Sequence, residues 1–413
     1  MAYDVTDPSL ADQGARRTAW AERSMPVLGL LRRRWAVEQP LAGRRVAACM
    51  HVTPETAALV RTLTAAGASV CLAACNPLST QDDVAATLVE QGVAVFARQG
   101  IDRAGYIAHL SAALDAGPEL LLDDGCDLVQ LLHAEPARLA GVRAGVEETT
   151  TGVLRLRQMT AEGALRLPMV AVNDTAVQRL VANRHGTGQS TLDAVLRATG
   201  VLLAGATVVV AGYGACGRGI AERARGLGAR VIVTEVDAGR ALEAVLDGHQ
   251  VLPMELAAGE AHVLITATGD RGVVRAEHLP LLRDGAVLAN AGHFDVEVDV
   301  RALEAAAVEV TRRVRPFVDS YELPDGRAVL LLAEGRLANL AAAEGHPAAV
   351  MDVSFAVQAL TLEWLVQTDL PPGVHGVPAA IDDEVSRTKL AALGVRFDVL
   401  TLDQEHYLSS WRP

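Results

Sequence analysis

The 413-residue chain contains almost no lysine and few aromatic residues. Lys389 is its single lysine, arginine supplies the other basic side chains, and aromatic residues make up 3% of the chain. Acidic residues outnumber basic ones, which gives a net charge of −13. Because phosphate binding requires a basic surface, this charge argues against nucleic acid as a partner. It favours a neutral or cationic small molecule.

Cysteine is scarce, and no long apolar run is present. The five cysteines are Cys49, Cys71, Cys75, Cys126 and Cys216. Their odd number and the absence of a CxxC pair predict a reducing compartment and no metal site. The first residues, MAYDVTDPSLADQGARR, contain no apolar signal segment, and no 18 uncharged apolar residues occur in a row. We therefore expect a soluble cytoplasmic protein with no membrane partner.

Short β-rich runs alternate with helical patterns between about residues 40 and 200. In order, these segments are RRVAACMHV, TPETAALVRTLTAAG, ASVCLAAC, TQDDVAATLVEQG and VAVFAR. Such alternation is typical of βαβ units and a parallel sheet. The chain is too long for one ordinary core, and half of its residues are hydrophobic. We therefore predict α/β architecture with two doubly wound parallel-sheet domains.

A second α/β unit begins at residues 206–237, ATVVVAGYGACGRGIAERARGLGARVIVTEVD. Gly212, Gly214 and Gly217 form a GxGxxG turn between a predicted strand and a predicted helix, and Glu235 ends the next strand. These glycines permit a tight turn, close approach to a pyrophosphate and close packing of helix on strand. They could serve the turn alone, but the full strand–turn–helix–strand context favours a dinucleotide site. Glu235 favours NAD over NADP, because a carboxylate repels a 2′-phosphate.

Further segments carry a family resemblance. They are CMHVTPETA (49–57), CNPLSTQDD (75–83), LLDDGCDL (121–128), EETTTG (147–152), VNDTAVQRLVAN (172–183), NAGHFDVEVDV (290–300), LLAEGRLANL (331–340) and GHPAAVM (345–351). Together with the glycine-rich turn, and in this order and spacing, they resemble S-adenosylhomocysteine hydrolase along nearly the whole chain.

The resemblance implies a domain arrangement. Residues 1–183 would begin a substrate-binding domain, residues 184–344 would form an NAD-binding Rossmann domain inserted into it, and residues 345–395 would return to the first domain. Residues 396–413 would be a C-terminal tail shorter than that of many family members, which changes the expected contact with a neighbouring subunit. The family also implies a homo-oligomer, either a dimer or a tetramer.

The resemblance also implies roles for individual residues. The catalytic residues would be His51, Asp124 and His293. The substrate-binding residues would be Thr53, Glu55, Glu148, Gln178, Ala182, Asn183, Thr187, His346 and Met351. The residues that bind NAD would be Thr149, Thr150, Thr151, Gly212, Gly214, Gly217, Glu235 and Asn339. Singly, most of these fit an ordinary structural role, such as a turn or a helix start. Their joint occurrence in this order favours an adenine nucleoside site.

Two positions depart from the family pattern. The family has a lysine where this chain has Gln178 and an aspartate where it has Ala182. On a helix, residues four apart face one way, so the family's carboxylate can orient and tune the lysine, whose neutral amine form serves as the base for a sugar hydroxyl. A glutamine cannot take that proton at neutral pH. Either His185, His293 or Asp124 takes it instead, or the reaction has changed.

Three functions agree with these residues. The first is an NAD-dependent enzyme that oxidises the sugar of an adenine nucleoside transiently and eliminates at the neighbouring carbon, with no net redox change. It would have diverged to a specialised substrate, for example by dehydrating a hexulosyl adenine nucleoside in antibiotic biosynthesis. The second is genuine S-adenosylhomocysteine hydrolysis with a substitute base, and the third is a non-catalytic regulator that binds adenosine or NAD. We favour the first, because the elimination-side residues are retained beside an altered base.

Overall fold

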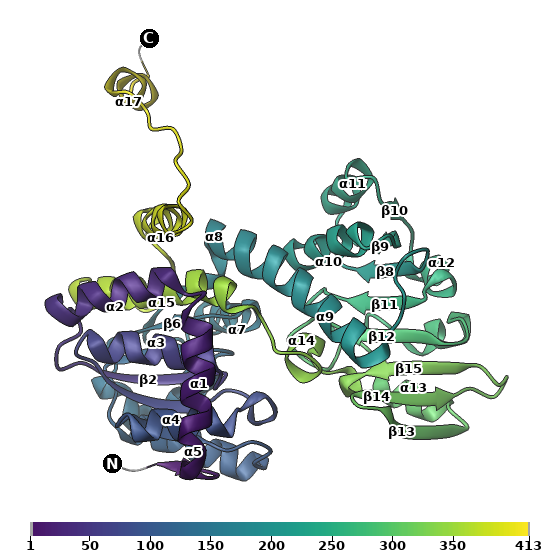
Figure 1. Cartoon of the computed structure of the whole chain (residues 1–413), viewed down its shortest axis with the longest axis horizontal. Coiled ribbons are helices and arrows are strands. Elements are labelled where there is room, and N and C mark those ends of the chain that lie inside the picture. Colours follow the sequence, from purple (N-terminus) through teal and green to yellow (C-terminus); the bar gives the residue numbers. More distant parts are fainter. Residues whose placement is uncertain (1–2, 412–413) are drawn as a thin grey trace.

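The computed structural model describes residues 3–411, so residues 1–2 and 412–413, which begin the predicted substrate domain and end the predicted tail, lie outside the described part. It contains two α/β domains, each built on an eight-stranded sheet (Figure 1). The predicted fold class is confirmed. Strands β1 to β7 and β16 form the sheet of the first domain, and strands β8 to β15 form the sheet of the second. The domain boundaries at residues 183, 344 and 395 stay predictions.

The first sheet is entirely parallel. Its strands, in spatial order, are β1 (Asp4–Val5), β4 (Ala94–Ala97), β3 (Ser69–Ala74), β2 (Arg45–Met50), β5 (Leu120–Asp123), β6 (Ala144–Glu147), β7 (Pro168–Ala171) and β16 (Gly373–Gly376). From β2 the chain proceeds through β3 and β4 toward one edge of the sheet, and from β5 it proceeds through β6 and β7 toward the other edge. A doubly wound sheet binds ligands where its strand order reverses, which here lies between β2 and β5.

Helices cover both faces of this sheet. They are α1 (Ala11–Glu22), α2 (Pro26–Glu38), α3 (Pro54–Ala65), α4 (Asp82–Glu90), α5 (Arg103–Asp115), α6 (Asp127–Ala134), α7 (Thr150–Ala161), α8 (Ala176–Gln178), α15 (Ala348–Gln367) and α16 (Ala379–Ala392), with short 3-10 turns η1 (Pro8–Leu10), η2 (Pro77–Ser79), η3 (Pro136–Gly141) and η4 (Val172–Asp174). Alternate residues of β2 face opposite cores: Val46 and Ala48 pack toward α3 and α15, whereas Ala47 and Cys49 pack toward α5 and α6. Both faces are therefore buried, as parallel sheets require.

The second sheet has a Rossmann strand order. Its strands are β10 (Gln250–Val251), β9 (Arg230–Thr234), β8 (Thr207–Ala211), β11 (Val263–Thr266), β12 (Ala286–Asn290), β15 (Ala328–Leu332), β14 (Val318–Glu322) and β13 (Glu309–Arg315). The first six are parallel, but β14 runs antiparallel to both of its neighbours. The sheet is therefore mixed at one edge, where a hairpin replaces the βαβ crossover that a parallel strand would need.

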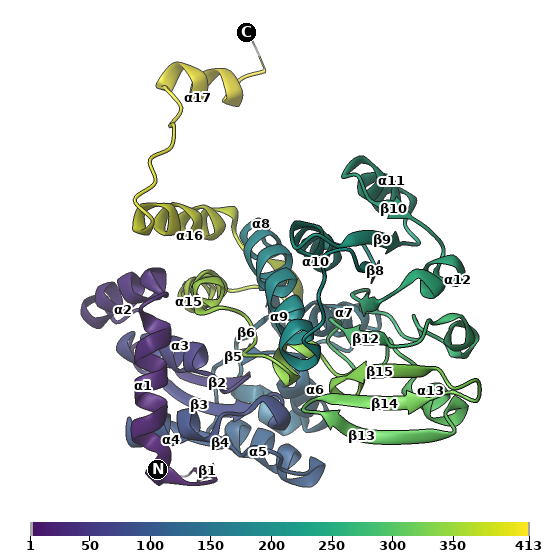
Figure 2. The ribbon, with the colours of Figure 1, turned by 45° about the vertical axis from the view of Figure 1, so that its right-hand side comes forward.

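In the second domain one helix, α9 (Gly188–Thr199), precedes the first strand, and the other helices come after strands. These are α10 (Ala215–Gly226), α11 (Ala238–Leu246), α12 (Met254–Ala257), α13 (Val300–Ala306) and α14 (Ala338–Ala341), with 3-10 turns η6 (Ala258–Glu260), η7 (Ala276–Leu281) and η8 (Ala333–Gly335). The last helix of the chain, α17 (Leu402–Ser409), stands away from both domains in Figures 1 and 2.

A π-helix, η5 (Arg179–Thr187), connects the two domains. The sequence analysis places positions 178 and 182 on a helix, and the segment is helical, with π-type hydrogen bonding from Arg179 onward. Short π-helical segments are rare and occur often at functional sites. Gln178, the last residue of α8, and Ala182 within η5 are both buried, as the four-residue spacing predicted.

Among the described residues, α15 is the one helix long and apolar enough to cross a membrane, but 67% of its most apolar stretch is buried inside the protein. It is a core helix that packs against α2, α3 and α16. Asp352 on this helix is fully buried, accepts hydrogen bonds from the backbone N–H groups of Val27 and Leu28, and pairs with Lys389 Nζ at 2.8 Å. The single lysine therefore ties α16 to the core.

Replacing Lys389 with methionine is expected to lower the free energy of unfolding by about 3 kcal/mol, because the buried Asp352 carboxylate loses its counter-charge. Urea unfolding followed by circular dichroism measures the change. The control is Arg157→Met, which removes an exposed ion pair with Asp174 and is expected to cost less than about 1 kcal/mol. Equal effects of the two substitutions would contradict the structural role of Lys389.

Candidate active site

Three predicted site residues, together with one cysteine that was not predicted, gather at the carboxyl ends of four adjacent strands. Cys75 follows β3, His51 follows β2, Asp124 follows β5 and Glu148 follows β6. Parallel strands direct their carboxyl ends to the same sheet edge, and the strand order reverses between β2 and β5. The fold therefore brings together residues that lie up to about a hundred positions apart.

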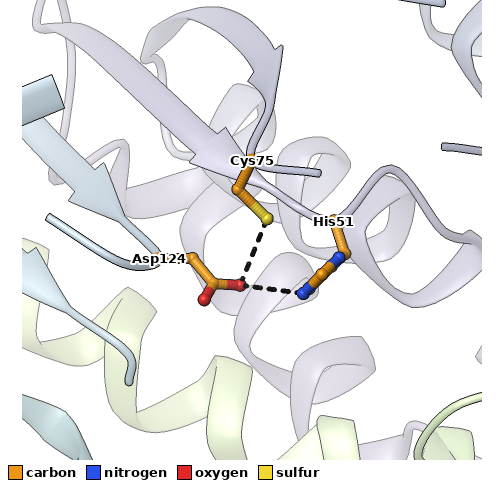
Figure 3. A group of neighbouring side chains, drawn as sticks. All are labelled: His51, Cys75 and Asp124. Atoms are coloured by element: carbon orange, nitrogen blue, oxygen red, sulfur yellow. Dashed lines mark hydrogen bonds and ion pairs between the residues drawn. The ribbon is translucent and has the colours of Figure 1, made fainter. Parts of the chain in front are cut away.

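His51, Cys75 and Asp124 form a compact cluster (Figure 3). Asp124 Oδ2 accepts a hydrogen bond from Cys75 Sγ at 3.6 Å and lies 3.7 Å from His51 Nε2. His51 Nδ1 lies 2.5 Å from the hydroxyl of Ser79, which fixes the orientation of the imidazole ring. Asp124 is almost fully buried, and its Oδ1 has no hydrogen-bond partner among the described residues. A buried carboxylate oxygen without a partner is unusual and marks Asp124 as a candidate functional group.

The same three residues could also hold a metal, because one ligand atom from each lies within 4.8 Å of the others. The sequence predicts no metal, and that expectation stays a prediction. The hydrogen bonds within the cluster fit proton transfer between neighbouring acid and base groups.

Glu147 holds the loop that carries Asp124. Its carboxylate accepts hydrogen bonds from the backbone N–H groups of Gly125, Cys126 and Thr149 and from the Thr149 hydroxyl. Cys126 has a left-handed backbone (φ 69°), which is uncommon for a residue with a side chain. Strained backbone of this kind persists where surrounding contacts fix it, often at an active site. Glu147 is therefore a positioning residue for Asp124.

The second domain contributes His293 to the same site. A cavity of about 690 Å³ is lined by His51, Asp124 and His293, and it extends toward Arg103 and Arg155. Burial lowers the pKa of His293. The three predicted catalytic residues therefore line one cavity, which also has room for a substituent longer than a hydroxyl group.

Arg155 connects the two domains at this cavity. Its guanidinium donates a hydrogen bond to the carbonyl of Gly125 at 2.8 Å and lies 4.8 Å from the ring centroid of Phe294. The cation–π contact fixes the loop that carries His293 against the loop that carries Asp124.

Gln178, at the position of the family's lysine, donates a hydrogen bond from Nε2 to Glu148 Oε1 at 2.9 Å. Glu148 also accepts hydrogen bonds from the Ser354 hydroxyl at 2.6 Å and from Gln358 Nε2. Burial raises the pKa of Glu148 to about 8, and the nearby Asp124 charge contributes to the rise. The structure therefore joins Gln178 and Glu148 in one hydrogen-bonded group.

The remaining predicted substrate residues lie around the same cleft. His346 Nε2 lies 3.0 Å from the Thr187 hydroxyl, and burial lowers the pKa of His346 to about 4, so this ring is neutral at pH 7. Asn183 donates a hydrogen bond to the side chain of Asn173. By contrast, His185 exposes its side chain on the outside of η5, which removes it as a base for a buried hydroxyl.

The predicted adenine contacts come from two helices. Thr53 caps α3 and Glu55 stands in its first turn, where burial raises the Glu55 pKa. Met351 is half-buried on α15 and packs against the core of the first domain. Their roles toward a ligand stay predictions.

The glycine-rich turn has the close contacts that a dinucleotide site requires. Gly212 has a left-handed backbone (φ 95°), and a Cβ atom at Gly217 would lie 1.9 Å from the carbonyl oxygen of Gly212. A Cβ at Gly214 would meet no atom closer than 3.8 Å, so that side of the turn is open. Helix α10 begins directly after Gly214 and directs its first N–H groups toward this space. The turn can therefore hold a pyrophosphate.

Asn339 supplies a second indication of a bound group. Its Nδ2 donates to Ser190 at 3.0 Å, but its buried Oδ1 has no hydrogen-bond partner among residues 3–411. A buried unpaired carbonyl is costly, and an amide N–H of a ligand such as nicotinamide would satisfy it. The residues present thus fit NAD. In contrast, the side chains of Thr149, Thr150 and Thr151 bond only within the first domain in the described part of the chain.

Sequence comparisons agree with this geometry. The family model described as "S-adenosyl-L-homocysteine hydrolase" matches residues 2–144, and the model of the family's NAD-binding domain matches residues 183–345. The chain is 54% identical over 415 aligned positions to an adenosylhomocysteinase of Aquifex aeolicus, with 100% of this chain and 99% of the relative covered. The chain belongs to the S-adenosylhomocysteine hydrolase family. It is therefore an NAD-dependent enzyme of the S-adenosylhomocysteine hydrolase type.

Other members of this hydrolase family add detail. The chain is 50% identical to an S-inosyl-L-homocysteine hydrolase of Methanopyrus kandleri, with 99% of the chain and 97% of the relative covered.

Among solved structures, a dipicolinate synthase chain from Bacillus halodurans has a TM-score of 0.51 at 14% identity, and the match covers 78% of this chain and 99% of that one. That likeness shows the fold alone. Because the alignment covers 99% of the Aquifex aeolicus relative, the tail length does not distinguish this chain from that hydrolase.

Glu235 is expected to select NAD over NADP. Its carboxylate stands at the end of β9 and is oriented by the backbone N–H groups of Tyr213, Val236 and Asp237. Replacing Glu235 with serine should weaken NAD binding about 10-fold, because a hydrogen bond to a charged group contributes about 1.5 kcal/mol or more, and should bring the two affinities closer. Calorimetric titration with each dinucleotide measures this, with Asp237→Asn as the control. An unchanged preference would contradict the assignment.

Several site residues were not assigned from the sequence. They are Cys75, Ser79, Glu147, Ser354 and Gln358. The first three lie inside segments that carry the family resemblance, so those segments contained a usable signal. Ser354 and Gln358 lie on the apolar helix α15, where only the fold shows that they approach Glu148.

Proposed function

We propose that this enzyme acts on an adenine nucleoside by transient oxidation of a sugar hydroxyl and elimination at the neighbouring carbon, and that its substrate is a specialised nucleoside that loses water. A hexulosyl adenine nucleoside, which would give an exocyclic alkene, is one such substrate. The observation that carries the proposal is the assembled cluster of His51, Asp124 and His293 beside an altered oxidation site at Gln178 and Ala182.

Each residue has a distinct part in this reaction. Bound NAD supplies the transient oxidation and returns the same electrons, so no net redox change occurs. The ketone acidifies the hydrogen on the adjacent carbon, and the unpartnered Oδ1 of Asp124 accepts it. His51, oriented by Ser79, donates a proton to the departing hydroxide, which leaves as water. His293 closes the cavity over these groups.

Hydrolysis of S-adenosylhomocysteine is the second candidate. The cavity of about 690 Å³ beside His51 has room for an amino acid substituent, and the Aquifex aeolicus relative is an adenosylhomocysteinase. The two candidates differ in the leaving group and in whether water adds back. We favour dehydration because the hydroxyl-side base of the family is replaced while the elimination cluster is retained.

Two incubations of the NAD-loaded enzyme distinguish the candidates. A hexulosyl adenine nucleoside should lose one water, detected by mass spectrometry, and S-adenosylhomocysteine should release little homocysteine to a thiol reagent. Brisk homocysteine release without dehydration would establish hydrolysis instead. If neither product forms but adenosine raises the melting temperature, the protein is a binder rather than a catalyst. Cofactor recycling within the site predicts that added NADH changes neither yield.

A further inference from the structure

The carboxylate of Glu148 is held entirely by uncharged donors. Gln178 and Ser354 donate to its Oε1, and Gln358 donates to its Oε2. These donors come from α8 and α15, which contact each other, and α15 also contacts β6. Three converging donors orient the carboxylate and stabilise its ionised form, but none of them supplies a counter-charge.

No cation compensates the charge of Glu148. None of the ion pairs formed within residues 3–411 includes this residue, and Lys389, the single lysine, is bonded to Asp352. The titratable groups on the elements around Glu148 include Asp123, Asp124, Glu147, Asp174, Arg179, Arg184, His185, Asp352 and Glu363. Arg179 pairs with Asp174, Arg184 with Glu222 and Glu363 with Arg34, while Asp123 accepts a hydrogen bond from the backbone of Val129. Glu147 is directed at the backbone of residues 125–126 and Asp352 at α2, so Asp124 is the charge that acts on Glu148. A like charge and burial both favour the neutral acid.

This environment differs from the one that a lysine at position 178 would create. An ammonium in the place of the Gln178 amide would pair with Glu148 and hold it ionised. With glutamine there, burial raises the Glu148 pKa to about 8, close to the pH at which a general base is most effective. Glu148 as a residue is only half-buried, and it follows β6, the strand next to β5, which Asp124 of the cavity wall follows.

We propose that Glu148 takes the proton of the sugar hydroxyl during the oxidation step, in place of the lysine that the family uses. The O–H bond breaks, its proton passes to a Glu148 oxygen, and the hydride on the same carbon passes to bound NAD as the carbonyl forms. Both return when the ketone is reduced, so the cycle balances. Gln178, Ser354 and Gln358 are positioning residues that orient the carboxylate.

The other candidate bases either act on the leaving-group side of the cavity or lie on the protein surface. Asp124 and His293 line the cavity with His51, on the side where the substituent leaves. His185 is exposed on η5. Glu148 is the carboxylate that the substituted residue itself contacts, at 2.9 Å. The inference rests on the proposed function only in requiring that a nucleoside sugar is oxidised.

The oxidation step can be measured separately from elimination. Mixing the NAD-loaded enzyme with adenosine and following NADH absorbance in a single turnover reports oxidation whether or not water is then lost. The wild-type rate should rise with pH and level off above an apparent pKa of about 8. Glu148→Gln should lower this rate about 100-fold or more, while calorimetry shows nucleoside binding within about 10-fold of wild type. Glu162→Gln, on the exposed end of α7, is the matched control.

Two further measurements separate a base from a structural acceptor. In Glu148→Gln with Gln178→Lys, the neutral amine form of the new lysine should restore at least about 10-fold of the oxidation rate, because it supplies a proton acceptor at the same place. Infrared spectroscopy of the resting holoenzyme should show a protonated carboxyl band that titrates near pH 8 and is absent from Glu148→Gln.

Different failures have different meanings. If Glu148→Gln oxidises adenosine within about 3-fold of the wild-type rate, or if no carboxyl band titrates near pH 8, the inference is overturned. If the hexulosyl nucleoside is not dehydrated but oxidation still depends on Glu148, the proposed substrate is wrong and the role of Glu148 stands.

Discussion

Replacing Asp124 with asparagine is expected to slow elimination by about 10²- to 10⁴-fold, the range typical of a lost general base. An amide cannot accept the hydrogen of the carbon next to the ketone. The side chain would keep its size, so the loop held by Glu147 and the ring of His51 should stay in place. Because oxidation precedes elimination, the variant should accumulate the oxidised sugar together with NADH.

Solvent exchange provides the measurement for Asp124→Asn. In deuterated water the wild type should exchange the hydrogen on that carbon, and the variant should exchange it slowly. Asp127→Asn is a suitable control, because Asp127 lines the same cavity but accepts a hydrogen bond from the Tyr106 hydroxyl at 2.7 Å. Exchange at the wild-type rate in Asp124→Asn would assign the proton transfer to another residue.

Restoring the family residues at positions 178 and 182 is the second large expected effect. Gln178→Lys with Ala182→Asp should raise homocysteine release from S-adenosylhomocysteine by about 100-fold or more at neutral pH. The new aspartate would orient the new lysine beside Glu148, and the neutral amine form of that lysine would accept the proton of the sugar hydroxyl. The wild-type Glu148 is mostly protonated at that pH, because its pKa is raised to about 8.

The single substitutions serve as controls for this pair. Ala182→Asp alone places a carboxylate at a buried position without a counter-charge, so it should lower the melting temperature. Gln178→Lys alone should give a smaller gain than the pair, since the ammonium lacks its tuning partner. If the pair brings no gain, then Thr187, which contacts His346, also limits hydrolysis.

The sequence predicted the parts of the fold that local patterns determine. The spacing of Gly212, Gly214 and Gly217 after an apolar run predicts the turn between β8 and α10, because the glycine geometry is set within a few residues. The strand–turn–helix–strand pattern predicted for residues 206–237 is confirmed as β8, α10 and β9. His51 and Asp124 lie close together because they follow neighbouring strands, β2 and β5. Only the family resemblance, and no local pattern, predicted that these two residues share a site.

Other features depend on contacts that a local pattern does not contain. A hydrophobic period does not distinguish α-helical from π-helical hydrogen bonding, so the sequence predicts an ordinary helix where η5 lies. The antiparallel edge of the second sheet depends on the pairing of β14 with β13 and β15. Glu148 and Gln358 are 210 residues apart, and only the packing of α15 on β6 joins them. The base assignment therefore required the structure.

The helix α17 and the segment before it have a consequence for protease resistance. Residues 395–401 have no regular structure, and all of residues 391–411 are exposed. Proteases cleave extended, exposed chain far faster than packed helices or strands. Brief digestion should therefore cut this segment first and leave a trimmed enzyme with both domains and the cavity. Because Arg396 is the only lysine or arginine in this segment, trypsin would cleave there and release α17 in one piece.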